Sequence, residues 1–313
     1  MKNLLKTMLA TSVLALATST VSAGEIAVIV KTTSSNFWQN VNKGATAAIG
    51  EQSEHTMSFN GPATESAVAD QVSLVENAIN RGVSAIVLAP SDPEALAPAV
   101  KRAFEAGIPV AIIDSGLAEG NEKYYQTFLS TDNCAAGEQA AKMMIENAGS
   151  SGKVAVMSYV AGVGSEIGRV GCFTKYIEDN SDIEIVGPLY SQSQMATALN
   201  QTTDTLAANG DLIGIFGANE PTAIGMGRAI EQAGKAGQLT AIGFDGNADL
   251  QDMVKSGTLL ATAVQGSFQM GELGVNAVID LLAGEKVTDF IDNGVVMVTK
   301  ENIDSPEAQN VLY

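Results

Sequence analysis

The sequence has few of the residues on which many kinds of catalysis depend. It contains one histidine, His55, one tryptophan and two cysteines. A Ser-His-Asp or Cys-His arrangement would have to use His55, which precedes a short strand pattern, and no G-x-S-x-G segment occurs. The chain is therefore not expected to be an enzyme.

Basic residues are also scarce, and long apolar runs are absent. Removing residues 1–23 takes away two lysines and no acidic residue, which leaves a formal charge of 15 − 35 = −20. Such a charge repels phosphate backbones and anionic lipid, so neither nucleic acid nor a membrane surface is an expected partner. No apolar run beyond the N-terminus reaches the roughly 18 residues that a membrane-spanning helix needs.

The N-terminus has the three parts of a secretory signal. Lys2 and Lys6 precede an apolar segment at residues 8–17, and small residues follow up to VSA at 21–23. These features predict a signal peptide over residues 1–23 and a cleaved, periplasmic protein of about 290 residues. The alternative is that the segment remains as a membrane anchor.

Cys134 and Cys172 are the two cysteines, and a disulfide between them could persist in an exported chain. The sequence does not reveal whether their Cα atoms lie within roughly 4.4 to 6.8 Å of each other, so pairing and free thiols stay equally open. Two cysteines without CxxC spacing and a single histidine do not supply the usual four ligands of zinc. We therefore expect no metal site, and no cofactor.

Strand patterns alternate with helical patterns along most of the chain. Strands are expected at residues 25–30, 56–59, 84–90, 108–114, 124–131, 153–159, 183–190, 212–219, 239–246, 258–265 and 295–299. One of the helices between them is expected to begin directly after Asp92-Pro93, an N-cap followed by proline. This alternation predicts βαβ units, and the chain length predicts two doubly wound α/β lobes with parallel sheets.

Residues 31–44 follow the first strand and form a candidate site. Lys31 begins a polar loop that leads to Phe37-Trp38 at the start of a helix. In an open parallel sheet, ligands bind at the carboxyl ends of the strands. From these residues alone, core packing of the two rings is the favoured interpretation, and Lys31 could be a solvated charge.

Seven segments along the chain carry a resemblance to a known family. They are KTTSSNFW (31–38), AIIDSG (111–116), STDN (130–133), AGVGSEIGRVGCF (161–173), FGANEPTAIG (216–225), IGFDG (242–246) and ATAVQ (261–265). In this order they resemble the bacterial periplasmic sugar-binding proteins of the ribose and allose type. Members of that family have two Rossmann-like lobes that close on a monosaccharide.

The resemblance implies a particular fold, the periplasmic binding protein-like I fold. Three crossings near Thr131, Gln265 and Asp292 would form a three-stranded hinge. The first lobe would comprise residues 24–131 and 266–291, and the second residues 132–265 and 292–313. The helix at 267–282 would return to the first lobe, and the terminal strand would join the second.

The resemblance also assigns a set of ligand-binding candidates. They are Lys31, Ser35, Phe37, Trp38, Asp114, Ser115, Glu166, Arg169, Ser193, Asn219, Asp245 and Gln265. The two rings would stack on a sugar, while the polar side chains would hydrogen-bond its hydroxyls. Ser35 stands where many members have asparagine, Ser115 where the ribose type has arginine, and Ser193 where relatives often have an aromatic residue.

Some of these candidates have ordinary structural interpretations as well. Asp114 could be an N-cap or turn residue, and Arg169 could form a surface ion pair with Glu166, three residues earlier on the same helix.

The resemblance implies a solute-binding protein that feeds an ABC importer, with the permease membrane subunits as partners and a monomeric state. A receptor for a furanosyl autoinducer or for a chemotactic sugar, with a chemoreceptor as partner, is the alternative. A repressor of the lac type shares the fold, but it would need a helix-turn-helix ahead of residue 25. A remote alternative is a nicotinamide-dependent oxidoreductase, because Gly162, Gly164 and Gly168 with Glu184 loosely match a dinucleotide motif.

Overall fold

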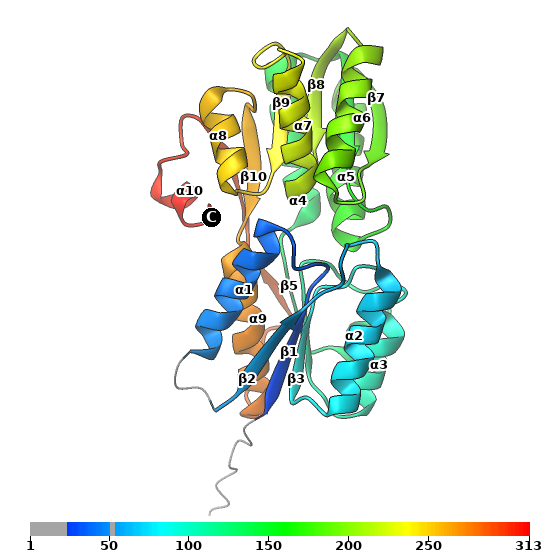
Figure 1. Cartoon of the computed structure of the whole chain (residues 1–313), viewed down its shortest axis with the longest axis vertical. Helices are drawn as coiled ribbons and strands as arrows, with labels where there is room; N and C mark the ends of the chain where they lie inside the picture. Colours follow the sequence, from blue (N-terminus) through cyan, green and yellow to red (C-terminus); the bar gives the residue numbers. More distant parts are fainter. Residues whose placement is uncertain (1–23, 51–53) are drawn as a thin grey trace, which may run out of the picture.

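The computed structural model describes residues 24–50 and 54–313, which form two α/β lobes stacked along the long axis of the molecule (Figure 1). The predicted signal peptide, residues 1–23, lies outside the described residues. In the part of the chain that is described, no helix is long and apolar enough to cross a membrane.

The first lobe contains a parallel six-stranded sheet with the order β11-β5-β4-β3-β1-β2. Its strands are β1 (Glu25–Ile29), β2 (Thr56–Asn60), β3 (Ala85–Leu88), β4 (Val110–Ile113), β5 (Thr127–Ser130) and β11 (Phe290–Asp292). Its helices are α1 (Asn36–Ile49), α2 (Val68–Arg81), α3 (Ala97–Glu105) and α9 (Ser267–Leu282), with a short 3-10 turn at Glu122–Tyr124.

The second lobe repeats this order as β12-β10-β9-β8-β6-β7, with β12 antiparallel to β10. Its strands are β6 (Ser151–Ser158), β7 (Asp182–Tyr190), β8 (Leu212–Gly217), β9 (Thr240–Phe244), β10 (Ala261–Gln265) and β12 (Val295–Thr299). Its helices are α4 (Asn133–Ala148), α5 (Gly164–Asn180), α6 (Met195–Ala208), α7 (Glu220–Gln232), α8 (Ala248–Ser256) and α10 (Pro306–Gln309). The prediction of two doubly wound lobes is confirmed.

One local prediction was wrong, and one strand was not predicted. Asp92 does not start α3: its Oδ1 accepts from the backbone N–H groups of Glu94 (2.9 Å) and Ala95 (2.7 Å), which closes a separate turn, and the helix begins at Ala97. The strand β11 was missed, because three residues are too few to show a periodic pattern.

The central strands of each sheet, β1, β3 and β4 in the first and β8, β9 and β10 in the second, are nearly continuously apolar because both faces of the sheet are covered there. Separate hydrophobic clusters lie on the two faces of the first sheet, and two more lie on the faces of the second. Strands buried on both faces require this near-continuous apolar character, which is why the sequence pattern located them.

The helix α9 packs against α1, so residues 267–282 belong to the first lobe. Gly44 of α1 and Gly271 of α9 make this close approach possible. A Cβ at Gly44 would collide with the carbonyl oxygen of Phe268, and one at Gly271 with that of Val41. A side chain at either glycine would therefore push the two helices apart.

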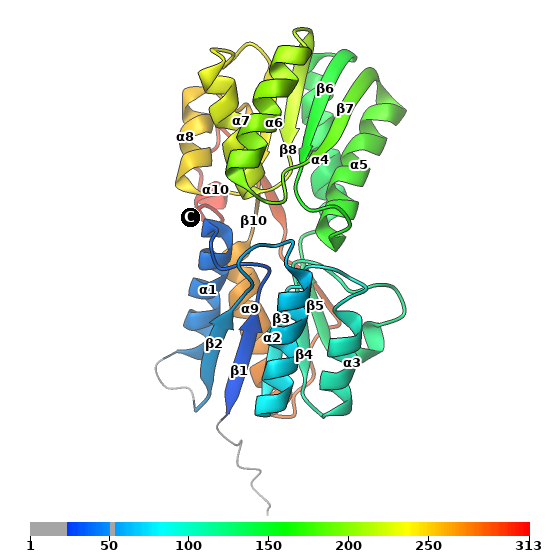
Figure 2. The same cartoon turned by 45° about the vertical axis from the view of Figure 1, so that its right-hand side comes forward.

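The chain passes between the lobes three times, and the three crossings are hydrogen-bonded to one another. Thr131, after β5, donates to Gln265 Oε1 at the end of β10 over 3.0 Å. Asn293, between β11 and β12, donates its Nδ2 to the carbonyl of Gly266 (3.0 Å) and its backbone N–H to that of Ser130 (3.2 Å). These hydrogen bonds tie the three crossings together in the region where the lobes meet (Figure 2).

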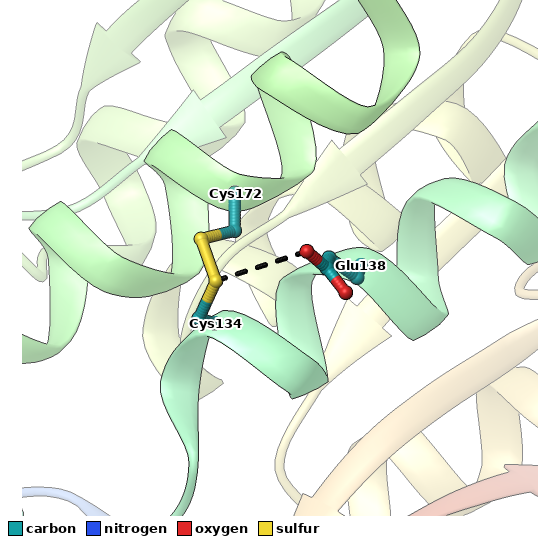
Figure 3. Close-up of side chains that lie close together, drawn as sticks. All are labelled: Cys134, Glu138 and Cys172. Carbon is teal, nitrogen blue, oxygen red and sulfur yellow. Dashed lines mark hydrogen bonds between the residues drawn. A yellow bond between two sulfur atoms is a disulfide. The ribbon is translucent and has the colours of Figure 1, made fainter. Parts of the chain in front are cut away.

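Cys134 of α4 and Cys172 of α5 form a disulfide with a Cα–Cα distance of 5.1 Å, which settles the question that the sequence left open (Figure 3). Glu138 Oε1 lies 3.9 Å from Cys134 Sγ. This is a contact without a donated hydrogen, because a bridged sulfur carries none. Sulfurs bonded to each other also present no thiolate to a metal.

Candidate ligand-binding site

A small cavity lies where the two lobes face each other. Its lining residues are Lys31, Ser35, Phe37, Trp38, Glu65, Asp114, Tyr159, Ser165, Arg169, Asn219, Glu220, Pro221, Asp245 and Gln265. Most of them follow the carboxyl ends of parallel strands, so both sheets contribute the edge at which such folds bind ligands.

The first lobe contributes an aromatic wall. Ser35 caps α1 by accepting from the Trp38 backbone N–H (3.3 Å), which sets Phe37 and Trp38 in the first turn. The two rings meet edge to face with centroids 4.8 Å apart. They belong to the first lobe's buried cluster and also line the cavity, so they act as core residues and as pocket wall together.

Trp38 is held in place by a residue that the sequence reasoning missed. Its Nε1–H donates to Glu65 Oε1 over 2.9 Å, and Glu65 Oε2 accepts from Ser193 of the second lobe over 2.5 Å. Glu65 lies in the loop after β2, away from any strand end. Only a carboxylate preceding a helical pattern was visible in the sequence.

Lys31 and Asp114 form a buried ion pair on the first-lobe side of the cavity. Lys31 Nζ lies 2.5 Å from Asp114 Oδ2 and donates to Ser115 Oγ over 2.7 Å. Because Lys31 is only 2% exposed, its interpretation as a solvated charge was wrong. Asp114 has a φ of 62°, in the left-handed region, which turns the chain sharply at the end of β4.

Arg169 of α5 is the cationic centre of the second lobe's side. It donates Nη1 to the carbonyl of Ala218 (2.6 Å) and Nη2 to Asn133 Oδ1 (2.7 Å), and its guanidinium lies 3.5 Å from the ring centroid of Phe244. At 2% exposure, it is not part of a surface ion pair. Glu166 instead accepts from Ser158 Oγ over 3.0 Å.

Asp245, Gln265 and Glu220 form a hydrogen-bonded group opposite the aromatic wall. Asp245 accepts from Gln265 Nε2 and from the Glu220 backbone N–H, each at 2.8 Å. Asn219 caps α7 and also donates to Ser193 Oγ over 3.0 Å. Burial raises the pKa of Asp245 to about 6, and burial together with the charge of Asp245 raises the pKa of Glu220 to about 7.

Because these pKa values are raised, the protein should become more stable, and not less, when the two carboxyls are protonated. A carboxyl whose folded pKa exceeds its unfolded one stabilises the fold as it takes up a proton. The free energy of unfolding should therefore rise as pH falls from about 7.5 to 5. For Glu220 the effect is at most about 3 kcal/mol. Urea unfolding of the ligand-free protein across this range measures it.

The neutral, isosteric variant Glu220→Gln is the control for that measurement. The high acidic charge of the chain also favours folding at lower pH, so only the difference in slope between the two proteins belongs to Glu220. Equal slopes would contradict the assignment.

Nine of the twelve candidates line the cavity, and Ser115, Glu166 and Ser193 lie just outside it. Ser115 and Ser193 hydrogen-bond residues of the wall, and Glu166 closes its own loop by accepting from the Gly162 backbone N–H (3.4 Å). Five lining residues were missed: Glu65, Tyr159, Ser165, Glu220 and Pro221. Three of these directly adjoin or lie close to predicted candidates, so only Glu65 and Tyr159 lacked a neighbouring signal.

The dinucleotide interpretation does not fit the geometry. Glu184 of β7 lies opposite Lys153 in the sheet register, near the start of β6. Lys153 is five residues before Ser158, which lies at the carboxyl end of β6. At about 3.3 Å per residue Glu184 is roughly 17 Å from the glycine-containing loop, whereas a ribose acceptor has to adjoin it.

Comparison with known proteins identifies the family. The model of the periplasmic binding protein domain matches residues 26–286. The chain belongs to the periplasmic binding protein family. The D-allose-binding periplasmic protein of Escherichia coli is 30% identical over 279 residues, covering 88% of this chain and 89% of that one.

Solved structures of periplasmic binding proteins agree with this assignment. An ABC transporter solute-binding protein from Agrobacterium vitis with bound D-fucose is 73% identical, with a TM-score of 0.92, covering 93% of this chain and all of that one. A periplasmic solute-binding protein from Actinobacillus succinogenes with bound D-allose is 30% identical, with a TM-score of 0.81, covering 89% and 98% of the two chains.

Proposed function

We propose that this periplasmic binding protein captures a monosaccharide between its two lobes and delivers it to an ABC importer. The observation that carries the proposal is the composition of the cavity, with two aromatic rings on one side and hydrogen-bonding side chains on the other. Pyranose rings need flat apolar surfaces for their C–H faces and fixed polar partners for their hydroxyls. The similar proteins support this role: one is a periplasmic allose-binding protein, and the other is an ABC transporter solute-binding protein with bound D-fucose.

We assign the individual contacts by their chemistry. Phe37 and Trp38 stack on the sugar ring, while the carboxylates of Asp114 and Asp245 accept from its hydroxyls and Arg169 donates to them. A hydrogen bond to a charged group contributes roughly 1.5 to 3 kcal/mol net, so a few such contacts with ring burial support micromolar or tighter binding. Binding of the ligand closes the cleft, and the protein bends at the three crossings.

The ligand class is a pyranose of the D-fucose kind. A similar protein at 73% identity has bound D-fucose, a 6-deoxyhexose, which supports a ligand without a polar group at its sixth carbon. Ser115 stands where ribose-type members have arginine, which supports a preference other than ribose. The protein is expected to act as a monomer, with the permease membrane subunits as its partners in transport.

A thermal-shift screen tests the proposal. D-fucose, D-galactose, D-arabinose, D-allose and D-ribose are compared at millimolar concentration, with L-fucose as the stereochemical control. At 100 times Kd a ligand stabilises the native state by about 2.7 kcal/mol, so the melting temperature should rise by several degrees for D-fucose and not for L-fucose. If no carbohydrate shifts the melting temperature, the proposal is wrong.

A further inference from the structure

The two lobes are joined by direct hydrogen bonds across the cleft as well as by the crossings. These bonds run from Lys31 Nζ to Ser165 Oγ (3.4 Å), from the Ser165 N–H to Ser115 Oγ (3.2 Å), from Ser193 Oγ to Glu65 Oε2 (2.5 Å) and from the Asn36 N–H to Glu220 Oε1 (2.9 Å). Opening of the cleft would break all four. The described arrangement is therefore a closed one.

The Glu220 contact differs from the others because its donor lies in the first turn of a helix. The side chain of Glu220, in the second lobe, reaches the N-terminus of α1 in the first lobe. Asn36 is the first residue of α1, and its backbone N–H has no partner within the helix. A carboxylate there accepts from a free N–H and meets the positive end of the helix dipole. Glu220 of the second lobe thus acts as a cap for a first-lobe helix.

Tyr313 holds the other oxygen of the same carboxylate. Its hydroxyl donates to Glu220 Oε2 over 3.0 Å. Its backbone is attached to the second lobe, because its N–H donates to the carbonyl of Gly246 (3.1 Å) and its carbonyl accepts from Gln251 (3.2 Å). The chain end marked C in Figures 1 and 2 lies where the lobes meet, beside the start of α1.

The ring of Tyr313 packs against the other lobe. It contacts the buried first-lobe cluster that contains Phe37, Trp38 and Val41. Opening of the cleft would therefore expose part of the ring and break the contact between Glu220 and Asn36 together. An interaction that exists in one state only shifts the equilibrium toward that state.

We propose that Tyr313 and Glu220 form a latch that stabilises the closed cleft and slows release of the ligand. Glu220 caps α1 across the cleft, and Tyr313 is a positioning residue that orients the carboxylate and adds apolar contact. The latch rests on the proposed function for its effect on ligand release, but its effect on closure does not depend on which ligand binds.

The first measurement is the fraction of closed molecules. Spin labels at Ala69→Cys on α2 and Asn200→Cys on α6, both at exposed positions, report the distance between the lobes. The full mature chain is compared with Tyr313→Phe, which keeps the ring and loses the hydroxyl, and with Tyr313→Ala, which loses both. The closed fraction should fall in the order unchanged chain, Tyr313→Phe, Tyr313→Ala, without ligand and with D-fucose.

The second measurement is the rate of release. Trp38 is the single tryptophan and lines the cavity, so its emission follows ligand dissociation directly. Release should be roughly tenfold faster in Tyr313→Ala, the effect expected for one hydrogen bond to a charged group with its supporting contact, while the association rate changes little. A residue that only stabilised the fold would lower the melting temperature without dividing the two rates in this way.

Tyr176→Ala is the matched control. Tyr176 is also a half-buried tyrosine of the second lobe, but it packs within that lobe only. It should leave the closed fraction and the release rate unchanged. If both quantities in Tyr313→Ala stay within twofold of the unchanged chain, there is no latch. If no sugar binds at all, the proposed function fails, and the ligand-free distances alone decide the latch.

Discussion

Replacing Arg169 with methionine should weaken sugar binding by two orders of magnitude or more. The variant keeps most of the length of the side chain and loses every donor. Each hydrogen bond from a charged group is worth roughly 1.5 to 3 kcal/mol, and Asp245 would lose the nearby positive charge that lowers its pKa. The pKa of Asp245 would then rise further, so a larger fraction of this carboxyl would be protonated and accept poorly from hydroxyls.

The same substitution should lower the free energy of unfolding by about 3 kcal/mol, because the carbonyl of Ala218 and the amide of Asn133 would lose their donor in a buried place. Calorimetric titration with D-fucose and urea unfolding give the two quantities. Arg228→Met is the control: Arg228 forms an exposed ion pair with Asp249, worth under about 1 kcal/mol, and lies outside the cavity wall. A Kd close to that of the unchanged chain in Arg169→Met would remove Arg169 from the ligand's partners.

Trp38→Ala should abolish binding and also lower the free energy of unfolding by about 3 to 5 kcal/mol. Both effects are expected because the indole is 2% exposed, packs in the first lobe's core and lines the cavity. The protein has to be assayed at low temperature, where the variant stays folded, so that the two effects separate.

Phe173→Ala is the matched control for Trp38→Ala. Phe173 is buried and stacks on Phe216 in the second lobe, with ring centroids 4.4 Å apart, but it does not line the cavity. We expect a similar loss of stability with binding retained. If the folded Trp38→Ala variant still binds D-fucose with unchanged affinity, Trp38 does not stack on the sugar.

The fold was predictable because buried parallel strands are apolar throughout and leave an unmistakable pattern. The pattern failed where an element is very short, as in β11, and where a side chain served a different local structure, as Asp92 does in the turn before α3. The disulfide was beyond the sequence, because pairing depends on a distance between α4 and α5 that no local pattern encodes.

The candidate site was predictable where a polar residue ends an apolar strand. Asp114, Asn219, Asp245 and Gln265 all follow this rule and line the cavity. Glu65 does not, because it reaches the site from the middle of a loop. Glu166 shows the opposite case. It lies in the first turn of α5, as the predicted site requires, but its carboxylate accepts hydrogen bonds from Ser158 and Gly162 just before that helix and does not line the cavity.

The placement of α9 and β11 affects the order in which the protein assembles. Both complete the first sheet and its cover, yet in the chain they follow the first five strands of the second sheet. The second sheet can form from nearly continuous sequence, whereas the first remains without its covering helix and edge strand until almost the entire polypeptide is available. A chain shortened before residue 267 should therefore present an uncovered, aggregation-prone first sheet.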